Sequence, residues 1–323
     1  MARDICIYLD FLQEKHKEEI RSCAASCGFT PHFFPLAQFE EARDCLQNCE
    51  ILYAHSPALL KEAPASLQWY ACAFAGVDPY CKEEGLFANP HCLLTNSNVY
   101  GLTISEHVLM VLLMLLRKMP RYEAMMEERQ WENQLPIRSI CGGRFTLLGT
   151  GDIGRSIAQR LHALGAARVL GLSRSGRPAP GFDEIRPIGE LDALLPETEV
   201  LILALPGTAE TAHILDGRRM ALLPRGALII NVGRGSAIEQ TALVDALNRG
   251  HLGGAALDVM EQEPLPREDP LWTARNVILT PHISGNMTLG YTCDKNVALF
   301  CDNLRRYAAG ERLQGLVDRR LGY

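Results

Sequence analysis

The sequence has neither a long hydrophobic run nor an excess of positive charge. Its longest apolar stretch, Val108–Leu116, has nine residues, whereas a membrane-spanning helix needs about 20. The formal net charge of −6 gives no electrostatic reason to expect nucleic acid or an anionic membrane as a partner. Residues 1–10 carry charges at Arg3 and Asp4 and lack the apolar core of a secretory signal. We therefore expect a cytoplasmic protein.

A metal-binding pattern is also missing, although the chain has 11 cysteines, eight of them before residue 100. Cys23 with Cys27, and Cys45 with Cys49, have a spacing of four residues that could bind a metal. No matching set of cysteines or histidines follows at zinc-site spacing. An odd number of cysteines without a secretory signal fits reduced thiols in the cytosol. We expect no metal.

Among the patterns that are present, the clearest is a glycine turn between a strand and a helix. The apolar run Phe145–Leu148 leads into Gly149-x-Gly151-x-x-Gly154, and apolar residues at helical spacing follow. In such a context Gly149 permits a tight turn, Gly151 lets the backbone approach a pyrophosphate, and Gly154 lets helix and strand pack closely. The pattern predicts a dinucleotide-binding site; the alternative is an ordinary βα turn that contains glycine.

Alternating strands and helices predict two α/β units with parallel sheets. The strands expected in the first unit are 5–9, 32–34, 50–54, 67–73 and 92–95, and those in the second are 145–148, 168–172, 200–205, 227–232, 254–259 and 277–280. The final helix, expected over 286–309, is long enough to return to the first unit. We thus predict a discontinuous substrate-binding domain, residues 1–99 and 287–323, and a dinucleotide-binding domain, residues 100–286.

A helix between these units carries the longest apolar run. Thr103-Ile-Ser-Glu106 has the form of a capping box and would open the helix. A helix that is apolar all round, as Val108–Leu116 would be, must be buried on all sides. It could cross between the two domains, pack against a second subunit, or do both.

Three further stretches, each after a strand, resemble the D-isomer-specific 2-hydroxyacid dehydrogenases: Asn231–Gly235, Asp258–Pro264 and Pro281–Gly285. The region from Ser66 through Ala75–Asp78 resembles that family's substrate-carboxylate loop, and 96–107 resembles its interdomain helix. The resemblance implies two Rossmann-like, doubly wound parallel-sheet domains with the active site in the cleft between them. It also implies a homodimer built around the nucleotide domain.

The chemistry of a 2-hydroxy or 2-oxo acid suits three of these residues. Such a reaction moves a hydride at C2 and a proton at its oxygen, and His282 is a group suited to that proton. A hydrogen-bonded carboxylate, Glu263, would favour the charged imidazole and fix its tautomer. Arg234 is suited to hold the substrate carboxylate and polarise the C2 carbonyl. Backbone N–H groups of the loop Ala75, Gly76 and Val77 could bind that carboxylate as well.

The residue after the second strand of the nucleotide unit bears on the cofactor. The acidic residue usual there is replaced by Ser173-Arg174-Ser175, which would suit a 2′-phosphate. We therefore expect NADP(H) to be preferred, with NAD(H) possible. By resemblance Asp258 meets the nicotinamide amide, although it could equally be a helix cap. The cofactor-binding residues that we predict are Gly149, Gly151, Asp152, Ile153, Gly154, Ser173, Arg174, Ser175, Leu205, Pro206, Val232, Gly233, Asp258, His282 and Gly285.

The leading interpretation is an NADP(H)-preferring reductase of small 2-oxo acids such as glyoxylate or hydroxypyruvate. One alternative is a reductase of bulkier 2-oxo acids, with candidate pocket residues Tyr70, Phe74, Tyr100, Met287 and Tyr291. Another is a dinucleotide-sensing interaction protein, since transcriptional corepressors share this fold and fold alone does not prove catalysis. No low-complexity interaction segment is visible, and the full Arg, Glu, His set favours an enzyme.

Overall fold

The computed structural model describes residues 3–83 and 85–322. The chain separates into two compact units. Unit 1 consists of Met1–Tyr100 and Met287–Tyr323, and unit 2 of Gly101–Asn286. Each unit is built on one parallel sheet, so the expected fold class of two parallel-sheet α/β domains is confirmed.

Unit 1 has a five-stranded sheet in the order β2-β1-β3-β4-β5, and every neighbouring pair is parallel. Helices α1 and α11 cover one face with Ile20, Val297 and Phe300, and α2 and α3 cover the other with Leu46 and Leu59. The elements of this unit are β1 (Arg3–Tyr8), α1 (Glu14–Ser26), β2 (Phe29–Phe34), α2 (Phe39–Leu46), β3 (Cys49–Ala54), α3 (Pro57–Lys61), β4 (Trp69–Cys72), α4 (Asp78–Lys82), β5 (Leu93–Thr95) and α11 (Gly290–Ala308).

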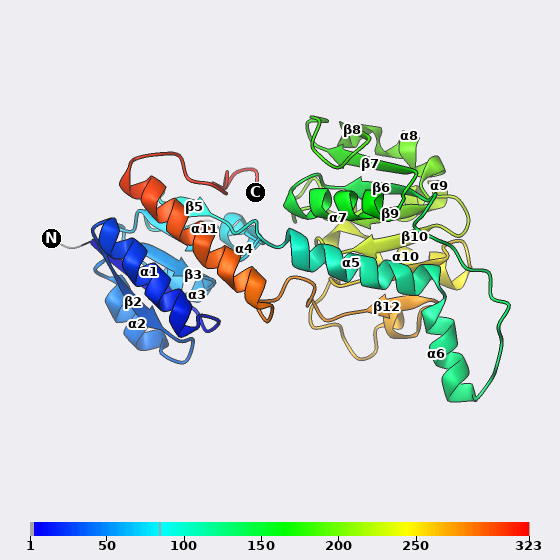
Figure 1. The fold of residues 1–323 in the computed structure, drawn as a ribbon, viewed down its shortest axis with the longest axis horizontal. Helices are drawn as coiled ribbons and strands as arrows, with labels where there is room; N and C mark the ends of the chain where they lie inside the picture. Colours follow the sequence, from blue (N-terminus) through cyan, green and yellow to red (C-terminus); the bar gives the residue numbers. More distant parts are fainter. Residues whose placement is uncertain (1–2, 84, 323) are drawn as a thin grey trace. The chain divides into compact units, whose positions relative to one another are not determined.

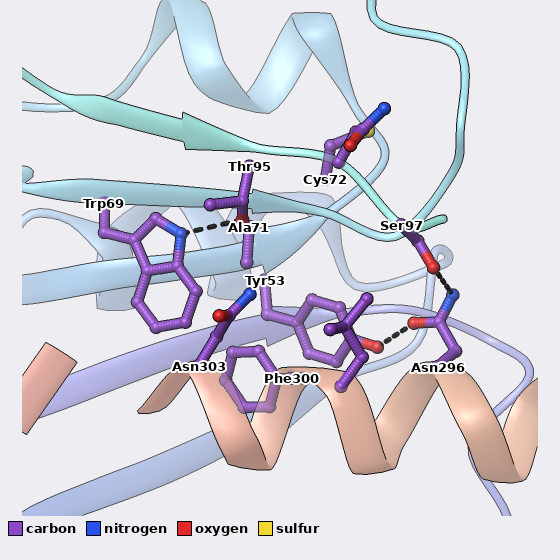
Figure 2. A pocket seen from close by; sticks show the side chains of 11 residues that line it. Tyr53, Trp69, Ala71, Cys72, Thr95, Ser97, Asn296, Phe300 and Asn303 are labelled. Atoms are coloured by element: carbon purple, nitrogen blue, oxygen red, sulfur yellow. Dashed lines mark hydrogen bonds between the residues drawn. The ribbon is translucent and has the colours of Figure 1, made fainter. Parts of the chain in front are cut away.

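Figure 2 shows the contacts that hold α11 against the sheet of unit 1. The ring of Tyr53 stacks on Phe300 with centroids 4.1 Å apart, and the indole of Trp69 donates to Thr95 Oγ1 at 2.9 Å. Asn296 accepts from the Tyr53 hydroxyl and donates to Ser97 Oγ at 2.9 Å. The cavity among these side chains measures about 10 Å³, room for about one water. This region is therefore core and not a ligand site.

Unit 2 has a seven-stranded parallel sheet in the order β12-β11-β10-β9-β6-β7-β8. The chain starts the sheet in the middle, at β6, continues outward to β8 and then returns to β9 on the other side of β6. The elements are α5 (Gly101–Leu116), α6 (Met119–Glu128), β6 (Arg144–Leu148), α7 (Asp152–Ala163), β7 (Arg168–Ser173), β8 (Glu184–Pro187), α8 (Leu191–Leu194), β9 (Val200–Leu203), α9 (Gly217–Leu222), β10 (Leu228–Asn231), α10 (Gln240–Asn248), β11 (Gly254–Leu257) and β12 (Val277–Leu279), with 3-10 turns Ile188–Glu190, Leu195–Glu197, Gly235–Ala237 and Pro270–Thr273.

This strand order places a topological switch point between β6 and β9, and ligands of open α/β sheets bind at the carboxyl ends of strands beside such a point. The glycine turn follows β6, and Leu205 and Pro206 follow β9. The two loops are adjacent, because a Cβ on Gly149 would lie 2.5 Å from the carbonyl oxygen of Ala204. Every predicted cofactor residue of unit 2 thus lies at this edge of the sheet or in the first turn of α7.

Two expectations about unit 2 were wrong. The sheet has a seventh strand, β8, which sequence reasoning missed because its sequence, Glu-Ile-Arg-Pro, lacks an apolar run. Pro187 is tolerated there because β8 is an edge strand. Helix α5 begins at Gly101, before the expected capping box, and Ser105 Oγ donates back to the carbonyl of Leu102 at 2.8 Å.

The apolar helix α5 is also not buried on all sides of this chain. Val108, Val111, Leu112 and Leu115 are buried, whereas Met110 is 48% and Leu113 42% exposed. Among the described residues, no helix combines the length and apolar composition needed to cross a membrane. The face of α5 that carries Met110 and Leu113 is therefore accessible to solvent in the single chain.

Candidate active site

The glycine turn has the geometry that its sequence predicts. Gly149 has φ 105°, in the left-handed region that favours glycine. A Cβ on Gly154 would clash with the carbonyl oxygen of Gly149, so this glycine is needed for close packing of α7 on the turn. A Cβ on Gly151 would meet no atom within 4 Å. Side chains are therefore excluded at Gly149 and Gly154, whereas Gly151, the residue before α7, faces open space.

The open side of this turn fits the pyrophosphate of a dinucleotide. The N-terminus of α7 offers backbone N–H groups and a partial positive charge for an anion. Asp152, at the first position of α7, accepts the N–H of Gly101 through Oδ2 at 2.7 Å. Burial raises the pKa of Asp152. This carboxylate therefore links α7 to the start of α5, and it is a helix-fixing group as well as a predicted neighbour of the cofactor.

The loop after β7 carries hydroxyls and arginines. Ser173 Oγ accepts the N–H of Gly176 at 3.1 Å, and Arg177 Nε donates to Ser175 Oγ at 3.2 Å. Arg174 is exposed. The next acidic residue, Asp183, accepts the N–H of Val169 at 2.7 Å and so is committed to the backbone. The loop thus presents positive charge where the sequence predicts a 2′-phosphate.

Arg234 stands on a turn held by a buried asparagine. Asn231, 1% exposed, donates to the carbonyl of Arg234 at 2.9 Å and accepts the N–H of Gly233 at 3.1 Å. The guanidinium donates to the carbonyl of Gly233 at 2.8 Å. This turn packs directly against the loop after β11, because a Cβ on Gly235 would clash with the carbonyl of Met260. Asn231, the last residue of β10, was not among the predicted site residues, although an asparagine at the end of a strand is a recognisable turn former.

His282 and Glu263, 19 residues apart in sequence, are in direct contact. His282 Nδ1 lies 2.7 Å from Glu263 Oε2, and Glu263 Oε1 accepts the N–H of Met260 at 3.0 Å. The imidazole is about half exposed, with 51% of the side chain accessible. The pair therefore has the arrangement of an oriented acid–base group, with one imidazole nitrogen fixed by a carboxylate and Nε2 left for chemistry.

Asp258 holds the loop that presents His282. It is 2% exposed, and its carboxylate accepts from Thr280 Oγ1 at 2.6 Å, Ile283 N at 3.0 Å and Ser284 N at 2.9 Å. Burial alone would raise the pKa of Asp258, but these hydrogen bonds outweigh it and lower the pKa. The N–H of His282 also donates to the Asp258 carbonyl at 2.9 Å. This support accounts for the left-handed backbone of His282, whose φ is 55°.

In unit 1 the predicted carboxylate loop follows β4. Asn96 Nδ2 donates to the carbonyl of Ala75 at 3.0 Å, while Val77 is buried and precedes α4. Two of the candidate pocket aromatics are core residues: Tyr70 is 0% and Tyr100 2% exposed. Tyr70 donates to the Tyr80 hydroxyl at 3.0 Å. Phe74, half-buried and stacked on Tyr100, remains beside the loop.

A parallel nucleotide-binding sheet, a phosphate-type glycine turn and a carboxylate-oriented histidine at one sheet edge define a dinucleotide-dependent oxidoreductase. The family model described as D-isomer specific 2-hydroxyacid dehydrogenase, NAD binding domain, matches residues 109–284. The chain belongs to the D-isomer specific 2-hydroxyacid dehydrogenase family. It is therefore an oxidoreductase, as predicted. In the described parts of the chain, no group of three or more His, Cys, Asp or Glu side chains is arranged to hold a metal ion.

Individual relatives support this assignment. Glyoxylate/hydroxypyruvate reductase A of Salmonella paratyphi B is 34% identical over 225 residues, which span 69% of this chain and 70% of that protein. A family member from Aeromonas salmonicida has 33% identity and a TM-score of 0.82, with 99% of this chain and 100% of that one covered. An NADPH-dependent glyoxylate/hydroxypyruvate reductase from Sinorhizobium meliloti, solved with NADP and sulfate, has 28% identity, the same coverage and a TM-score of 0.83.

Proposed function

We propose that this enzyme uses NADPH to reduce a small 2-oxo acid, of the glyoxylate or hydroxypyruvate type, to the 2-hydroxy acid, with D configuration where C2 is a stereocentre. The observation that carries the proposal is the 2.7 Å contact between His282 and Glu263 at the sheet edge that also bears the glycine turn. The similarity to glyoxylate/hydroxypyruvate reductases supports the substrate class.

Each catalytic side chain has one role in this reaction. The dinucleotide, when bound, supplies the hydride for C2. His282 donates a proton from Nε2 to the C2 oxygen, and Glu263 stabilises the charged imidazole that makes this donation possible. Arg234 pairs with the substrate carboxylate and polarises the C2 carbonyl, a task suited to its planar fork of donors. Its Nη1 donates to the Gly233 carbonyl at 2.8 Å, which restrains the orientation of the guanidinium.

The remaining predicted ligands keep the roles that the sequence suggests. Gly149, Gly151 and Gly154 with the start of α7 take the pyrophosphate, and Ser173, Arg174 and Ser175 take a 2′-phosphate. The neighbour from Sinorhizobium meliloti carries NADP, which supports this preference, with NAD(H) as the weaker cofactor. In unit 1, the N–H groups of the Ala75–Val77 loop stay our predicted ligands for the substrate carboxylate.

A homodimer is part of the proposal. Exposed apolar side chains lie along α5, α6 and the segment after α6. Of these, α6 and the segment after it project from the rest of unit 2 (Figure 1). The exposed side chains are Met110, Leu113, Met119, Met126, Trp131 and Ile137, and Trp131 is 95% exposed. Burying such residues against a second copy would remove an aggregation-prone surface. We also propose a cytosolic location, supported by 11 cysteines that are all free thiols.

The test is a rate panel with wild type and His282→Ala. Wild type should oxidise NADPH with glyoxylate and hydroxypyruvate faster than with phenylpyruvate or branched 2-oxo acids. His282→Ala should lower kcat by about 10²-fold or more, the usual scale for a general acid–base residue. A folded variant with near-normal turnover would show that another group donates the proton, and flat rates with every acid would refute the reductase assignment.

A further inference from the structure

Three thiols lie in or against the core cluster that α2 covers in unit 1. Cys6 lies on β1, Cys49 is the first residue of β3, and Cys45 is in the last turn of α2. Cys6 and Cys49 are 0% and 2% exposed, whereas Cys45 is partly exposed. Only Cys45 of the three is therefore accessible to a small reagent from solvent.

Cys45 and Cys49 are in contact through their sulfur atoms. Their Sγ atoms are 3.7 Å apart, and the Cys49 thiol donates to the Cys45 carbonyl at 3.2 Å. A disulfide requires the two sulfurs to approach to about 2.05 Å. Cys23 and Cys27 have the same spacing but other partners: Cys23 donates to the Cys301 carbonyl at 3.3 Å, and Cys27 lies 3.8 Å from Ser26 Oγ.

The surroundings distinguish the two sulfurs chemically. Hydrogen bonds from the Cys49 and Cys6 thiols, with the nearby His32, lower the pKa of Cys45 against the opposing effect of burial. The hydrogen bond with Cys45, followed by burial, raises the pKa of Cys49. His32 is itself placed by Asp4, whose carboxylate lies 2.9 Å from Nε2. Cys45, the partly exposed member, is therefore the sulfur that a small reagent reaches first, and the direction of its pKa agrees with this order.

We propose that Cys45 and Cys49 form a reversible thiol–disulfide pair that reacts with low-molecular-weight disulfides. The Cys45 thiolate attacks one sulfur of the small disulfide, forms a mixed disulfide and releases one thiolate. Cys49 then loses its proton and attacks the Cys45 sulfur, which releases the second thiolate and closes the intramolecular disulfide. Two protein thiols are oxidised by two electrons, and one small disulfide is reduced to two thiols.

Within unit 1, this pair is separated from the loop that we propose binds the substrate carboxylate. Cys49 begins β3, and the Ala75–Val77 loop follows the carboxyl end of β4, so the two sites are at opposite edges of the same sheet. Disulfides in the cytosol are usually transient and redox-responsive, which fits a pair with one exposed and one buried member. The proposal does not depend on the reductase activity.

The experiment equilibrates the folded full-length protein in glutathione buffers of increasing oxidised fraction, then alkylates the remaining thiols in denaturant and digests with trypsin. Cleavage after Arg43 and Lys61 leaves Cys45 and Cys49 alone together in one peptide, 44–61. We expect this peptide to lose two hydrogens and to escape alkylation as the buffer becomes oxidising. Cys141, exposed and the only cysteine between residues 101 and 286, should stop at the glutathione adduct.

Variants separate the two chemical steps. In Cys49→Ser, Cys45 should accumulate the glutathione adduct, and in Cys45→Ser, Cys49 should stay alkylatable. The wild-type protein alone is also sufficient to test the proposal. The proposal is overturned if peptide 44–61 keeps both thiols while Cys141 is fully modified, if Cys45 stops at the mixed disulfide in wild type, or if Cys45 becomes linked to the peptide that contains Cys6.

Discussion

His282 Nδ1 is 2.7 Å from Glu263 Oε2, and the second oxygen of that carboxylate is held at 3.0 Å by the N–H of Met260. The backbone thus holds one oxygen of Glu263, while the other oxygen orients the imidazole. A carboxylate at this distance fixes the tautomer of the imidazole and orients Nε2 for proton donation.

Glu263→Gln should therefore lower kcat. The amide keeps a partner for Met260 but removes the negative charge next to the imidazole. A charge-assisted hydrogen bond of about 1.5–3 kcal/mol, discounted because the pair is partly solvated, predicts a fall of about tenfold. The measurement is kcat for the 2-oxo acid with saturating NADPH.

The chain offers a matched control for this substitution. His213 Nε2 lies 2.7 Å from Glu261 Oε1, with a similar exposure of both side chains. Glu261→Gln should leave kcat unchanged, because that pair lies outside the proposed chemistry. Equal kcat for wild type and Glu263→Gln would show that Glu263 does not support the proton donor.

The glycine turn allows binding to be separated from folding. Gly154→Ala places a methyl group on the Gly149 carbonyl and should destabilise the protein by about 1–3 kcal/mol, as overpacking does. A methyl group at Gly151 would point into open space. The free energy of unfolding of Gly151→Ala should therefore stay within about 0.5 kcal/mol of the wild-type value, while NADPH affinity falls about tenfold or more. Urea unfolding and NADPH titration by fluorescence measure the two effects. Wild-type affinity in Gly151→Ala would refute its assignment to the pyrophosphate.

These examples show which parts of the site could be predicted from the sequence. The roles of Gly149 and Gly154 are local, because strand, turn and helix are consecutive, and they follow from the spacing. The support from Thr280 to Asp258 joins residues 22 positions apart, and no local pattern indicates it. Strand β8 was missed because an edge strand with charged residues and proline has no apolar signal.

Adjacent leucines on α5 should respond differently to a charge. Leu112 is 0% exposed, so Leu112→Glu buries an unpaired carboxylate and should cost several kcal/mol or prevent folding. Leu113 is 42% exposed, so Leu113→Glu should leave the fold intact and yield monomers if this face joins two copies. Sedimentation at micromolar concentration distinguishes the cases. A wild-type monomer, or a Leu113→Glu dimer as stable as wild type, would argue against the proposed interface.

His107 predicts a pH-dependent part of the stability. Burial lowers its pKa, and the Asp258 carboxylate, 4.0 Å away, offsets this only in part. Because the unfolded chain binds the proton more tightly, the neutral ring contributes stability above the unfolded pKa of about 6.5. That stability is lost as pH falls through the lower folded value. Urea midpoints should drop less from about pH 7.5 to about pH 5.5 in His107→Gln than in wild type. His91→Gln, an exposed control, should behave like wild type; an unchanged drop in His107→Gln would contradict the burial argument.

The last prediction concerns the choice of cofactor. An acidic side chain at the end of the second nucleotide strand would accept the ribose 2′-hydroxyl and repel a 2′-phosphate. Here β7 ends at Ser173, Arg174 follows it, and the next carboxylate, Asp183, is engaged with a backbone N–H. NADPH should therefore be the better substrate. A guanidinium pairs with a phosphate through charge-assisted hydrogen bonds.

Arg174→Ala should weaken the binding of NADPH about tenfold or more, which corresponds to the loss of one contact of about 1.5–3 kcal/mol. The binding of NADH should be nearly unchanged. Arg177→Ala is the control, because Arg177 donates to Ser175 within the same loop and should have the smaller effect. The measurement is kcat/KM for both cofactors in all three proteins. If Arg174 were only a solvated loop charge, both cofactors would respond equally to its removal, and a wild type faster with NADH would overturn the assignment of the 2′-phosphate to this loop.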